Sequence, residues 1–175
     1  MAVPIEIDVW QGEIAELEVD AILVPANESL FMTAPVARAL RLRAGEAVER
    51  DAVQQGPVEA GTAVVTGGGE LAAPYVIHVV GVGHDLQPDA ARLRRALDAG
   101  LELAARLGLA RLAVAPVGVE RGVFDPAAAA SVLARVLTDR ATFGAPLPAS
   151  LVVAVSGPAE AVAYGSALAA MRATA

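Results

Sequence analysis

Apolar and polar residues follow each other along parts of this chain with the periods that distinguish strands from helices. The alternation over residues 5–9, Ile-Glu-Ile-Asp-Val, predicts a half-exposed strand. The apolar run from Val19 to Asn27 is nearly continuous, which is typical of a strand buried on both faces. It ends abruptly in Pro25 and the side-chain amide of Asn27. Ligands of open α/β sheets bind beyond the carboxyl ends of the strands, so Asn27 is the first candidate functional residue.

Helical patterns follow this buried strand. Val36–Arg43 is predicted to form a helix that has Pro35 in its first turn and stops at Gly45. Glu46–Gln55 is predicted as a second short helix. The two strands that precede these helices are separated by only about ten residues, which is too few for a standard crossover helix. They are expected either to pair antiparallel or to lie apart.

Two further strands are predicted in the middle of the chain. Thr62–Thr66 is a short β-branched run, and Tyr75–Val82 is a longer apolar one. The turn Gly67-Gly68-Gly69 lies between them. This spacing predicts a hairpin or an adjacent antiparallel pair.

The second half of the chain alternates regularly between helices and strands. Leu93, Leu97 and Leu101 fall on one stripe of a helix over residues 88–108. The other predicted elements are strands over 112–117 and 151–155 and helices over 127–138 and 158–171. Such alternation predicts parallel strands joined by right-handed crossovers. Because neither a repeat nor a linker interrupts it, the chain is expected to form a single three-layer α/β/α domain, residues 1–175, around a mixed, largely parallel sheet.

Composition narrows the classes of function. The chain is 55% hydrophobic but only 3% aromatic, so its core must be built mainly from Ala, Val and Leu. The net charge of −7 repels phosphate backbones, and the 13 basic residues are spread along the chain without a cluster. Nucleic-acid binding is therefore not expected.

Cysteine and histidine usage argues against several kinds of site. With no Cys and only 2 His, neither a disulfide framework nor a thiolate metal site is expected, and no cofactor is predicted. His84-Asp85 does not make a catalytic dyad, because neighbours on a chain point apart. Ser156 lacks the flanking glycines of a nucleophile elbow. No segment has the apolar length of a membrane helix, and no signal peptide is recognised, so a cytoplasmic location is expected.

Three separated blocks resemble the macro domain, a module that binds ADP-ribose. The family's Gln-Gly-Asp-Ile corresponds to residues 11–14, Gln-Gly-Glu-Ile. Its Val-Asp-Ala-Ile-Val-Asn-Ala-Ala-Asn corresponds to residues 19–27, with departures at Leu23, Val24 and Pro25. Its Tyr-Val-Ile-His strand is unchanged at residues 75–78. The resemblance implies the same α/β fold and, in the cleft at the carboxyl ends of the strands, a site for ADP-ribose or a related nucleotide.

The resemblance also implies roles for individual residues. Glu13 takes the place of the aspartate that accepts a hydrogen bond from the adenine amino group, and Ile14 belongs to the same motif. Asn27 matches the asparagine that contacts the distal ribose. Alternatively, Glu13 is a solvated carboxylate beside a turn, and Asn27 is a turn residue that caps local backbone.

The two phosphate loops depart most from the family. Residues 32–35, Met-Thr-Ala-Pro, replace a run of glycines, and Pro35 has no N–H to offer a phosphate. Arg38 either substitutes a positive charge or is an exposed helix residue. The second loop is Gly118-Val119-Glu120-Arg121-Gly122, in which two glycines remain and Glu120 opposes an anion. Arg121 either offsets Glu120 or pairs with it, and Phe124 lies against the ligand or in the core.

Three classes of function follow from these residues. The chain is a binding module for ADP-ribose or a related nucleotide, an ADP-ribosyl hydrolase in which Asn27 positions a water, or a structural protein with a decayed site. The altered loops predict weak binding without efficient hydrolysis, because misplacing reacting groups by about 1 Å costs on the order of 100-fold in rate.

Overall fold

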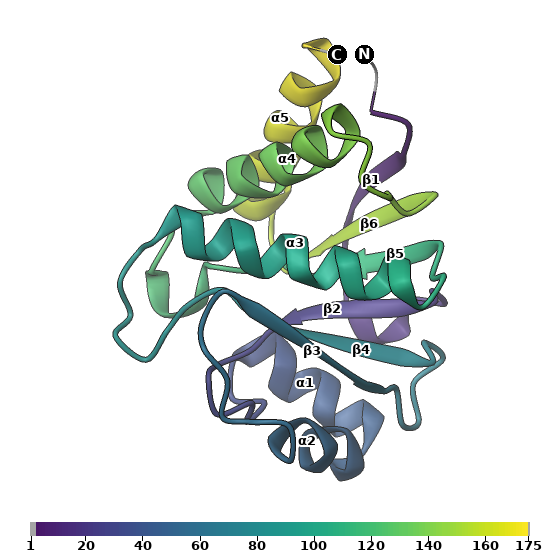
Figure 1. Ribbon diagram of the computed structural model, residues 1–175, viewed down its shortest axis with the longest axis vertical. Helices are drawn as coiled ribbons and strands as arrows, with labels where there is room; N and C mark the ends of the chain where they lie inside the picture. The colour runs from purple at the N-terminus through teal and green to yellow at the C-terminus, as the bar shows by residue number, and fades with distance from the viewer. Residues whose placement is uncertain (1–2, 175) are drawn as a thin grey trace.

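The computed structural model describes residues 3–174, in which a mixed sheet lies between two layers of helices (Figure 1). Within that range the six strands are β1 (Glu6–Gln11), β2 (Ala21–Pro25), β3 (Thr62–Gly67), β4 (Tyr75–Val80), β5 (Arg111–Val114) and β6 (Ser150–Val155). The α-helices are α1 (Pro35–Ala44), α2 (Glu46–Val53), α3 (Ala90–Arg106), α4 (Pro126–Thr142) and α5 (Pro158–Ala173). Short 3-10 turns cover Ile14–Glu16 and Glu120–Gly122.

The strand order is β1-β6-β5-β2-β4-β3, and every pair except β3 with β4 is parallel. The predicted antiparallel pair of β3 and β4 is confirmed. The open question of the two early strands is also answered, because β6 and β5 separate β1 from β2. The carboxyl ends of β1, β6, β5, β2 and β4 therefore meet at one edge of the sheet.

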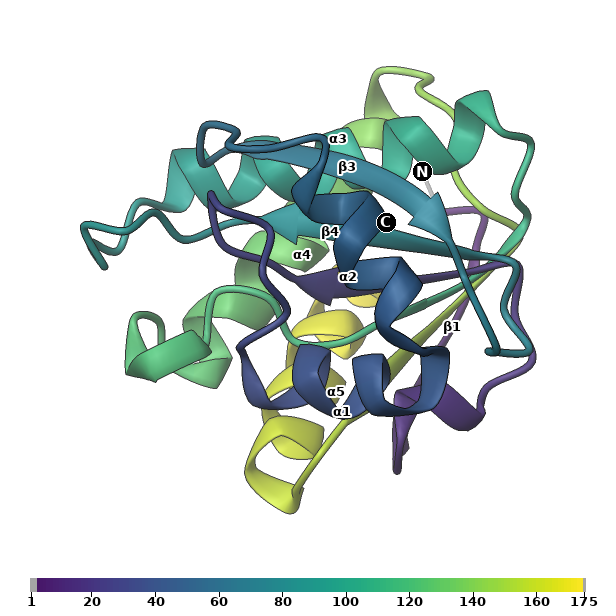
Figure 2. The same ribbon diagram turned by 90° about the horizontal axis from the view of Figure 1, so that it is seen from below.

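Alternation along the strands divides the core into two layers. In β2, the side chain of Leu23 packs with residues of α3, α4 and α5, whereas Ile22 and Val24 pack with α1 and α2. Figure 2, seen from below, shows α1 and α2 in front of the sheet. Both faces of β2 are thus buried, as the apolar run predicted.

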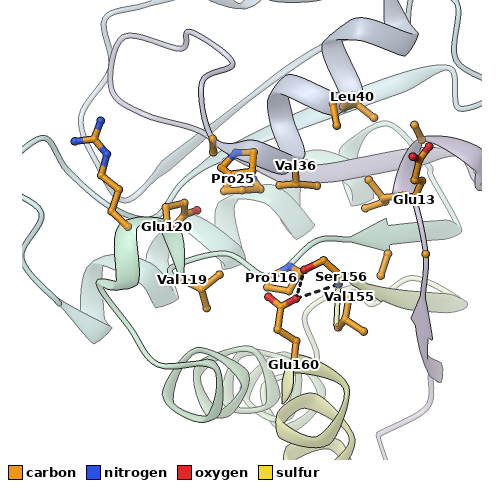
Figure 3. A pocket seen from close by; sticks show the side chains of 18 residues that line it. Glu13, Pro25, Val36, Leu40, Pro116, Val119, Glu120, Val155, Ser156 and Glu160 are labelled. Carbon is orange, nitrogen blue, oxygen red and sulfur yellow. Dashed lines mark hydrogen bonds between the residues drawn. The ribbon is translucent and has the colours of Figure 1, made fainter. Parts of the chain in front are cut away.

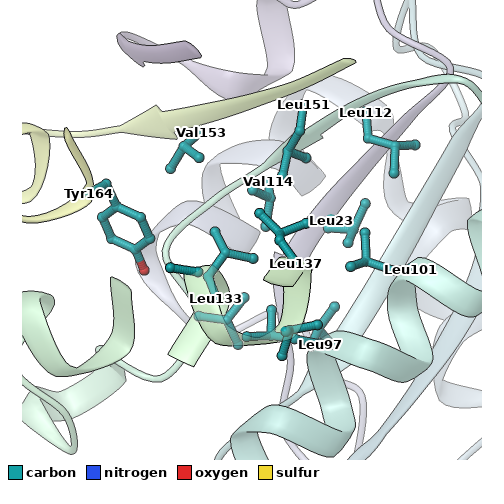
Figure 4. Close-up of a cluster of buried hydrophobic side chains, with 14 of the residues drawn as sticks. Leu23, Leu97, Leu101, Leu112, Val114, Leu133, Leu137, Leu151, Val153 and Tyr164 are labelled. Atoms are coloured by element: carbon teal, nitrogen blue, oxygen red, sulfur yellow. The ribbon is translucent and has the colours of Figure 1, made fainter. Parts of the chain in front are cut away.

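The larger layer is filled mainly by Leu, Val and Ala (Figure 4). Leu97 and Leu101 of α3 contribute to it together with Leu133 and Leu137 of α4. Small residues allow close approach: a Cβ added to Gly100 of α3 would lie 3.2 Å from Cγ2 of Val79. No helix within residues 3–174 combines the length and the apolar character that a membrane span requires.

Several predicted boundaries were wrong by a few residues. β5 ends at Val114 instead of Val117, because Pro116 has no N–H to extend the ladder. β4 ends at Val80 instead of Val82. α4 continues to Thr142 beyond the predicted Thr138, and its start is capped by Asp125, whose carboxylate accepts the N–H of Ala128 at 2.8 Å.

His78 lies in β4 between the apolar residues Ile77 and Val79. It is fully buried, and its Nε2 lies 2.9 Å from the hydroxyl of Thr66. Burial lowers the pKa of His78 to about 4, so the ring is neutral at physiological pH and is packed as part of the protein interior.

Candidate functional site

Two adjoining cavities lie at the edge where the parallel strands end. The first has a volume of about 410 Å³ and contains Glu13 in its wall, and we call it the Glu13 cavity. The second has a volume of about 310 Å³ and contains Asn27, and we call it the Asn27 cavity. Five residues line both: Pro25, Ala34, Pro35, Glu120 and Arg121. Together the two cavities form one cleft, with the phosphate-loop positions at its middle.

The Glu13 cavity has mainly apolar walls (Figure 3). Ile14 is buried and lines this cavity, while Val36 and Leu40 of α1 face Val119 across it. The side chain of Glu13 is 65% exposed, and its carboxylate pairs with Nη1 of Arg43 at 3.1 Å. Glu13 thus remains accessible to a ligand, although its carboxylate already forms an ion pair with Arg43.

Ser156 and Glu160 form a polar contact in this cavity that the sequence did not reveal. One carboxylate oxygen of Glu160, Oε1, accepts the Ser156 backbone N–H at 3.0 Å and its hydroxyl at 2.6 Å. Ser156 follows β6 directly, and Glu160 lies in the first turn of α5. Their position beyond a buried parallel strand is the same signal that singled out Asn27.

Asn27 is oriented by the loop that follows it. Its Nδ2 donates to the carbonyl oxygen of Phe31 at 2.9 Å and to the hydroxyl of Thr33 at 3.1 Å. Its Oδ1 is buried, and nothing among residues 3–174 donates to it. Asn27 therefore both holds the local loop, as the turn interpretation supposed, and keeps an acceptor for a further donor.

In the first loop, residues 32–35, two backbone N–H groups donate within the chain. The N–H of Met32 donates to Oε2 of Glu49 at 2.7 Å, and Oε1 of Glu49 pairs with Arg41 at 2.8 Å. The N–H of Thr33 donates to the Phe31 carbonyl. Pro35 begins α1 and has no N–H. Because the Met32 and Thr33 donors are used within the chain and Pro35 has none, we call this loop closed.

The second loop, residues 118–122, retains its sharp backbone conformation. Gly118 has φ 99° and Gly122 has φ 69°, both in the left-handed region that favours glycine. Arg121 has φ 53° without being glycine, a conformation that costs about 1 kcal/mol. Its side chain is exposed, and no carboxylate within residues 3–174 forms an ion pair with it, so the possible Glu120–Arg121 pair is not formed.

Glu120 occupies the second loop with its own carboxylate. Its Oε2 accepts the N–H of Gly118 at 2.8 Å, whereas Oε1 is buried without a partner in the described part of the chain. Burial raises the pKa of Glu120 to about 7, and the hydrogen bond from Gly118 offsets only part of that shift. Above pH 7 the second loop therefore carries an anion of its own where an anionic ligand would need a donor.

Phe124 and Arg38 lie outside the walls of both cavities, whereas His84 lines the Asn27 cavity. Phe124 packs partly buried against the core, and its N–H donates to the Gly118 carbonyl at 2.9 Å, so it supports the loop from below. Arg38 is exposed on α1. His84 pairs with Glu28 at 3.2 Å and Asp85 with Arg92 at 3.0 Å, so the two neighbours point apart as expected. Across residues 3–174, no three His, Asp or Glu side chains gather as metal ligands.

Comparison with known proteins identifies the class of protein that this fold and cleft define. The sequence profile of the family described as Macro domain matches residues 24–133. The chain therefore belongs to the macro domain family. An uncharacterized protein of Aeropyrum pernix is 33% identical over 138 residues, which span 71% of this chain and 70% of that protein. One of Aquifex aeolicus is 37% identical over 100 residues, 57% of this chain and 61% of that protein.

Solved structures show the same fold at lower identity. The macrodomain of Trypanosoma brucei in complex with ADP-ribose superposes with a TM-score of 0.84 at 22% identity, covering 92% of this chain and 68% of that one. The Oceanobacillus iheyensis macrodomain with ADP gives a TM-score of 0.81 at 20% identity, covering 95% of this chain and 92% of that one.

Proposed function

We propose that the cleft binds ADP-ribose or a related nucleotide. The base lies in the Glu13 cavity beside Glu13 and Ile14, and the distal ribose lies in the Asn27 cavity. The observation that carries the proposal is the pair of adjoining cavities joined at Arg121, which lines both. Membership of the macro domain family supports it, as do two structural relatives crystallised with ADP-ribose and ADP.

Binding in this proposal is weak. In the first loop the Met32 N–H donates to Glu49, and in the second loop the Gly118 N–H donates to Glu120. Neither N–H is then available to a phosphate. Each lost hydrogen bond to a charged phosphate removes roughly 1.5 to 3 kcal/mol, so losing two weakens a micromolar site to about millimolar. Arg121 supplies partial compensation, because its guanidinium has no competing carboxylate within residues 3–174.

Efficient hydrolysis of ADP-ribosyl bonds is not part of the proposal, since the loops do not fix the diphosphate. One observation nevertheless favours a hydrolase as a second candidate. Glu120 lines the Asn27 cavity, keeps one oxygen free, and has a pKa of about 7, which suits a general base that activates water. If neither binding nor turnover is found, the third class, a structural protein, remains. Organisation of residues 1–175 as one domain and a cytoplasmic location stay predictions.

Calorimetric titration with ADP-ribose and ADP tests the proposal. We expect dissociation constants of roughly 0.1 to 1 mM for both ligands. Asn27→Ala should weaken the binding of ADP-ribose severalfold further, but not that of ADP, which lacks the distal ribose. Glu13→Ala should weaken both ligands equally. A turnover assay on ADP-ribosylated protein and on O-acetyl-ADP-ribose runs alongside. Turnover that Asn27→Ala or Glu120→Gln abolishes would replace the binding module with the hydrolase.

A further inference from the structure

The Ser156–Glu160 contact leaves one carboxylate oxygen available to a ligand. Oε1 of Glu160 already accepts two hydrogen bonds, from the N–H and the hydroxyl of Ser156. These bonds fix the carboxylate in place, so its second oxygen can accept a hydrogen bond without a large loss of side-chain entropy. Figure 3 shows the carboxylate reaching from α5 toward Pro116 and Ser156, inside the Glu13 cavity.

The position of Glu160 along the cleft assigns it to one part of a nucleotide. Figure 3 shows Glu120 at one end of the Glu13 cavity, Glu13 at the other, and Glu160 between them. In the proposed function the diphosphate lies beside Glu120 and Arg121, and the base lies beside Glu13. The ribose that joins the base to the diphosphate must therefore lie beside Glu160.

The hydrogen-bonding capacity of a carboxylate limits the ligand groups that Glu160 can bind. An ionised carboxylate has only acceptors, so it recognises hydroxyl or amino donors and repels phosphate. Val119 and Pro116 line the cavity next to it, and such apolar surroundings strengthen a charge-assisted bond. Glu13, by contrast, is exposed and already paired with Arg43. Glu160 is thus the better fixed of these two acceptors in the cavity.

We propose that Glu160 accepts a hydrogen bond from the 2′-hydroxyl of the ribose next to the base, and that Ser156 positions it. The cavity then selects ribonucleosides over their 2′-deoxy forms and rejects a 2′-phosphate. This inference rests on the proposed function, because it assumes that a nucleoside occupies the Glu13 cavity. Glu160 is a specificity-determining residue in this arrangement, without a role in bond cleavage.

The test compares ligands that differ only at the 2′ position. ADP, 2′-deoxy-ADP and ADP with a 2′-phosphate are titrated into the protein and followed by NMR, with the Ser156 amide as a local probe. We expect ADP to bind about tenfold more tightly than either analogue, because a site built around a substrate hydroxyl discriminates strongly against its absence. In Glu160→Gln both ratios should fall to about threefold or less, because the carboxylate charge is gone.

Two further variants control for structure. Ser156→Ala leaves the carboxylate but removes one of its two donors, so the ratio for 2′-deoxy-ADP should fall to an intermediate value. Glu70→Gln alters an exposed glutamate in the turn between β3 and β4, at the opposite edge of the sheet, and should leave all ratios unchanged. Because each ratio is measured on one variant, a general loss of stability does not move it.

The outcomes separate this inference from the proposed function. Equal affinity of the unaltered protein for ADP and 2′-deoxy-ADP overturns the inference and leaves nucleotide binding intact. If ADP does not bind, the proposed function fails, and adenosine is compared with 2′-deoxyadenosine at millimolar concentration. A preference for adenosine that Glu160→Gln removes sustains the inference without phosphates. Absence of such a preference, or of any binding, overturns it.

Discussion

The two loops at the middle of the cleft each give a backbone N–H to a glutamate of the same chain, but they differ in what balances the glutamate's charge. In the first loop Met32 donates to Glu49, and Arg41 pairs with that carboxylate at 2.8 Å. In the second loop Gly118 donates to Glu120, whose carboxylate has no cation within hydrogen-bond reach among residues 3–174. The pKa of Glu120 is raised, because the burial of its carboxylate is not offset by an opposite charge.

The two loops therefore differ in how firmly their donor is held. In the first loop the accepting glutamate is also paired with an arginine, whereas in the second loop the accepting glutamate has no ion-pair partner among residues 3–174. An ion pair with Arg41 and a hydrogen bond from the Met32 N–H both hold the Glu49 carboxylate, so the first loop keeps its donor occupied. Glu120 is held by one hydrogen bond against the cost of burying its charge, so protonation or substitution changes the second loop at little expense. Ligand affinity should therefore respond to changes in the second loop and hardly at all to changes in the first.

The largest expected effect is on the pH dependence of stability. The pKa of Glu120 is raised from 4.5 to about 7 in the folded protein, so the folded state binds more protons than the unfolded state between these values. The free energy of unfolding should fall by about 2 to 3 kcal/mol as pH rises from 4.5 to above 7. Urea unfolding at pH 5 and pH 8 measures this loss. In Glu120→Gln the loss should shrink by that amount, and an unchanged loss would contradict the assignment.

The next effect concerns affinity. Glu120→Gln removes a negative charge within about 5 Å of the expected diphosphate, which is worth roughly 1 to 2 kcal/mol or about 5- to 30-fold in the dissociation constant for ADP-ribose. Calorimetry at pH 8 measures it. Glu49→Gln in the first loop is the matched control, expected to lower stability without tightening binding. Equal gains from both variants would show that the two loops are equivalent after all.

A smaller effect is expected at Arg121. Arg121→Ala should weaken ADP-ribose binding about fivefold, since a charge-assisted contact to phosphate is lost at an exposed position. Arg121→Gly should weaken it equally but raise the free energy of unfolding by about 1 kcal/mol, because glycine accepts the φ of 53°. Titration and thermal unfolding of both variants separate the charge from the backbone. Arg38→Ala on α1 serves as the neutral comparison.

The smallest effect is expected from Pro35→Gly in the first loop. It restores an N–H at the start of α1, but the Met32 donor stays with Glu49. The affinity for ADP-ribose should change less than about twofold, while the free energy of unfolding falls by about 1 kcal/mol through added freedom of the unfolded chain. A tenfold gain in affinity would refute the view that the first loop is closed.

Local patterns in the sequence predicted the elements of the fold well, because each strand and helix carries its own period. The buried strand before Asn27, the pair β3–β4 and the three closing helices all follow from such patterns. The separation of β1 from β2 does not, because it depends on a pairing of β1 with β6 more than a hundred residues away. The resemblance to the macro domain supplied the family, which the match over residues 24–133 confirms.

The candidate site was predictable only in part. Glu13, Ile14, Asn27 and the second loop were located by the family motifs, and the structure places Glu13, Ile14, Asn27 and residues 119–121 in the cavity walls. Motifs say nothing of a side chain that folds back onto its own loop, as Glu120 does onto Gly118. They also missed Glu160, because its entry into the cavity depends on where the last strand lies in the sheet.

The pairing of β1 with β6 has a consequence for the order in which the cleft is assembled during synthesis. Ile7 of β1 must wait for its partner Leu151, whereas β2 and β4 are made close together. At 5 to 20 residues per second, a ribosome needs roughly 7 to 30 s to make the intervening chain. The half of the cleft at Asn27 can therefore form early, but the half at Glu13 and Glu160 exists only when the last strand and helix have emerged. A nascent chain stalled before β6 would display an unpaired β1 to chaperones.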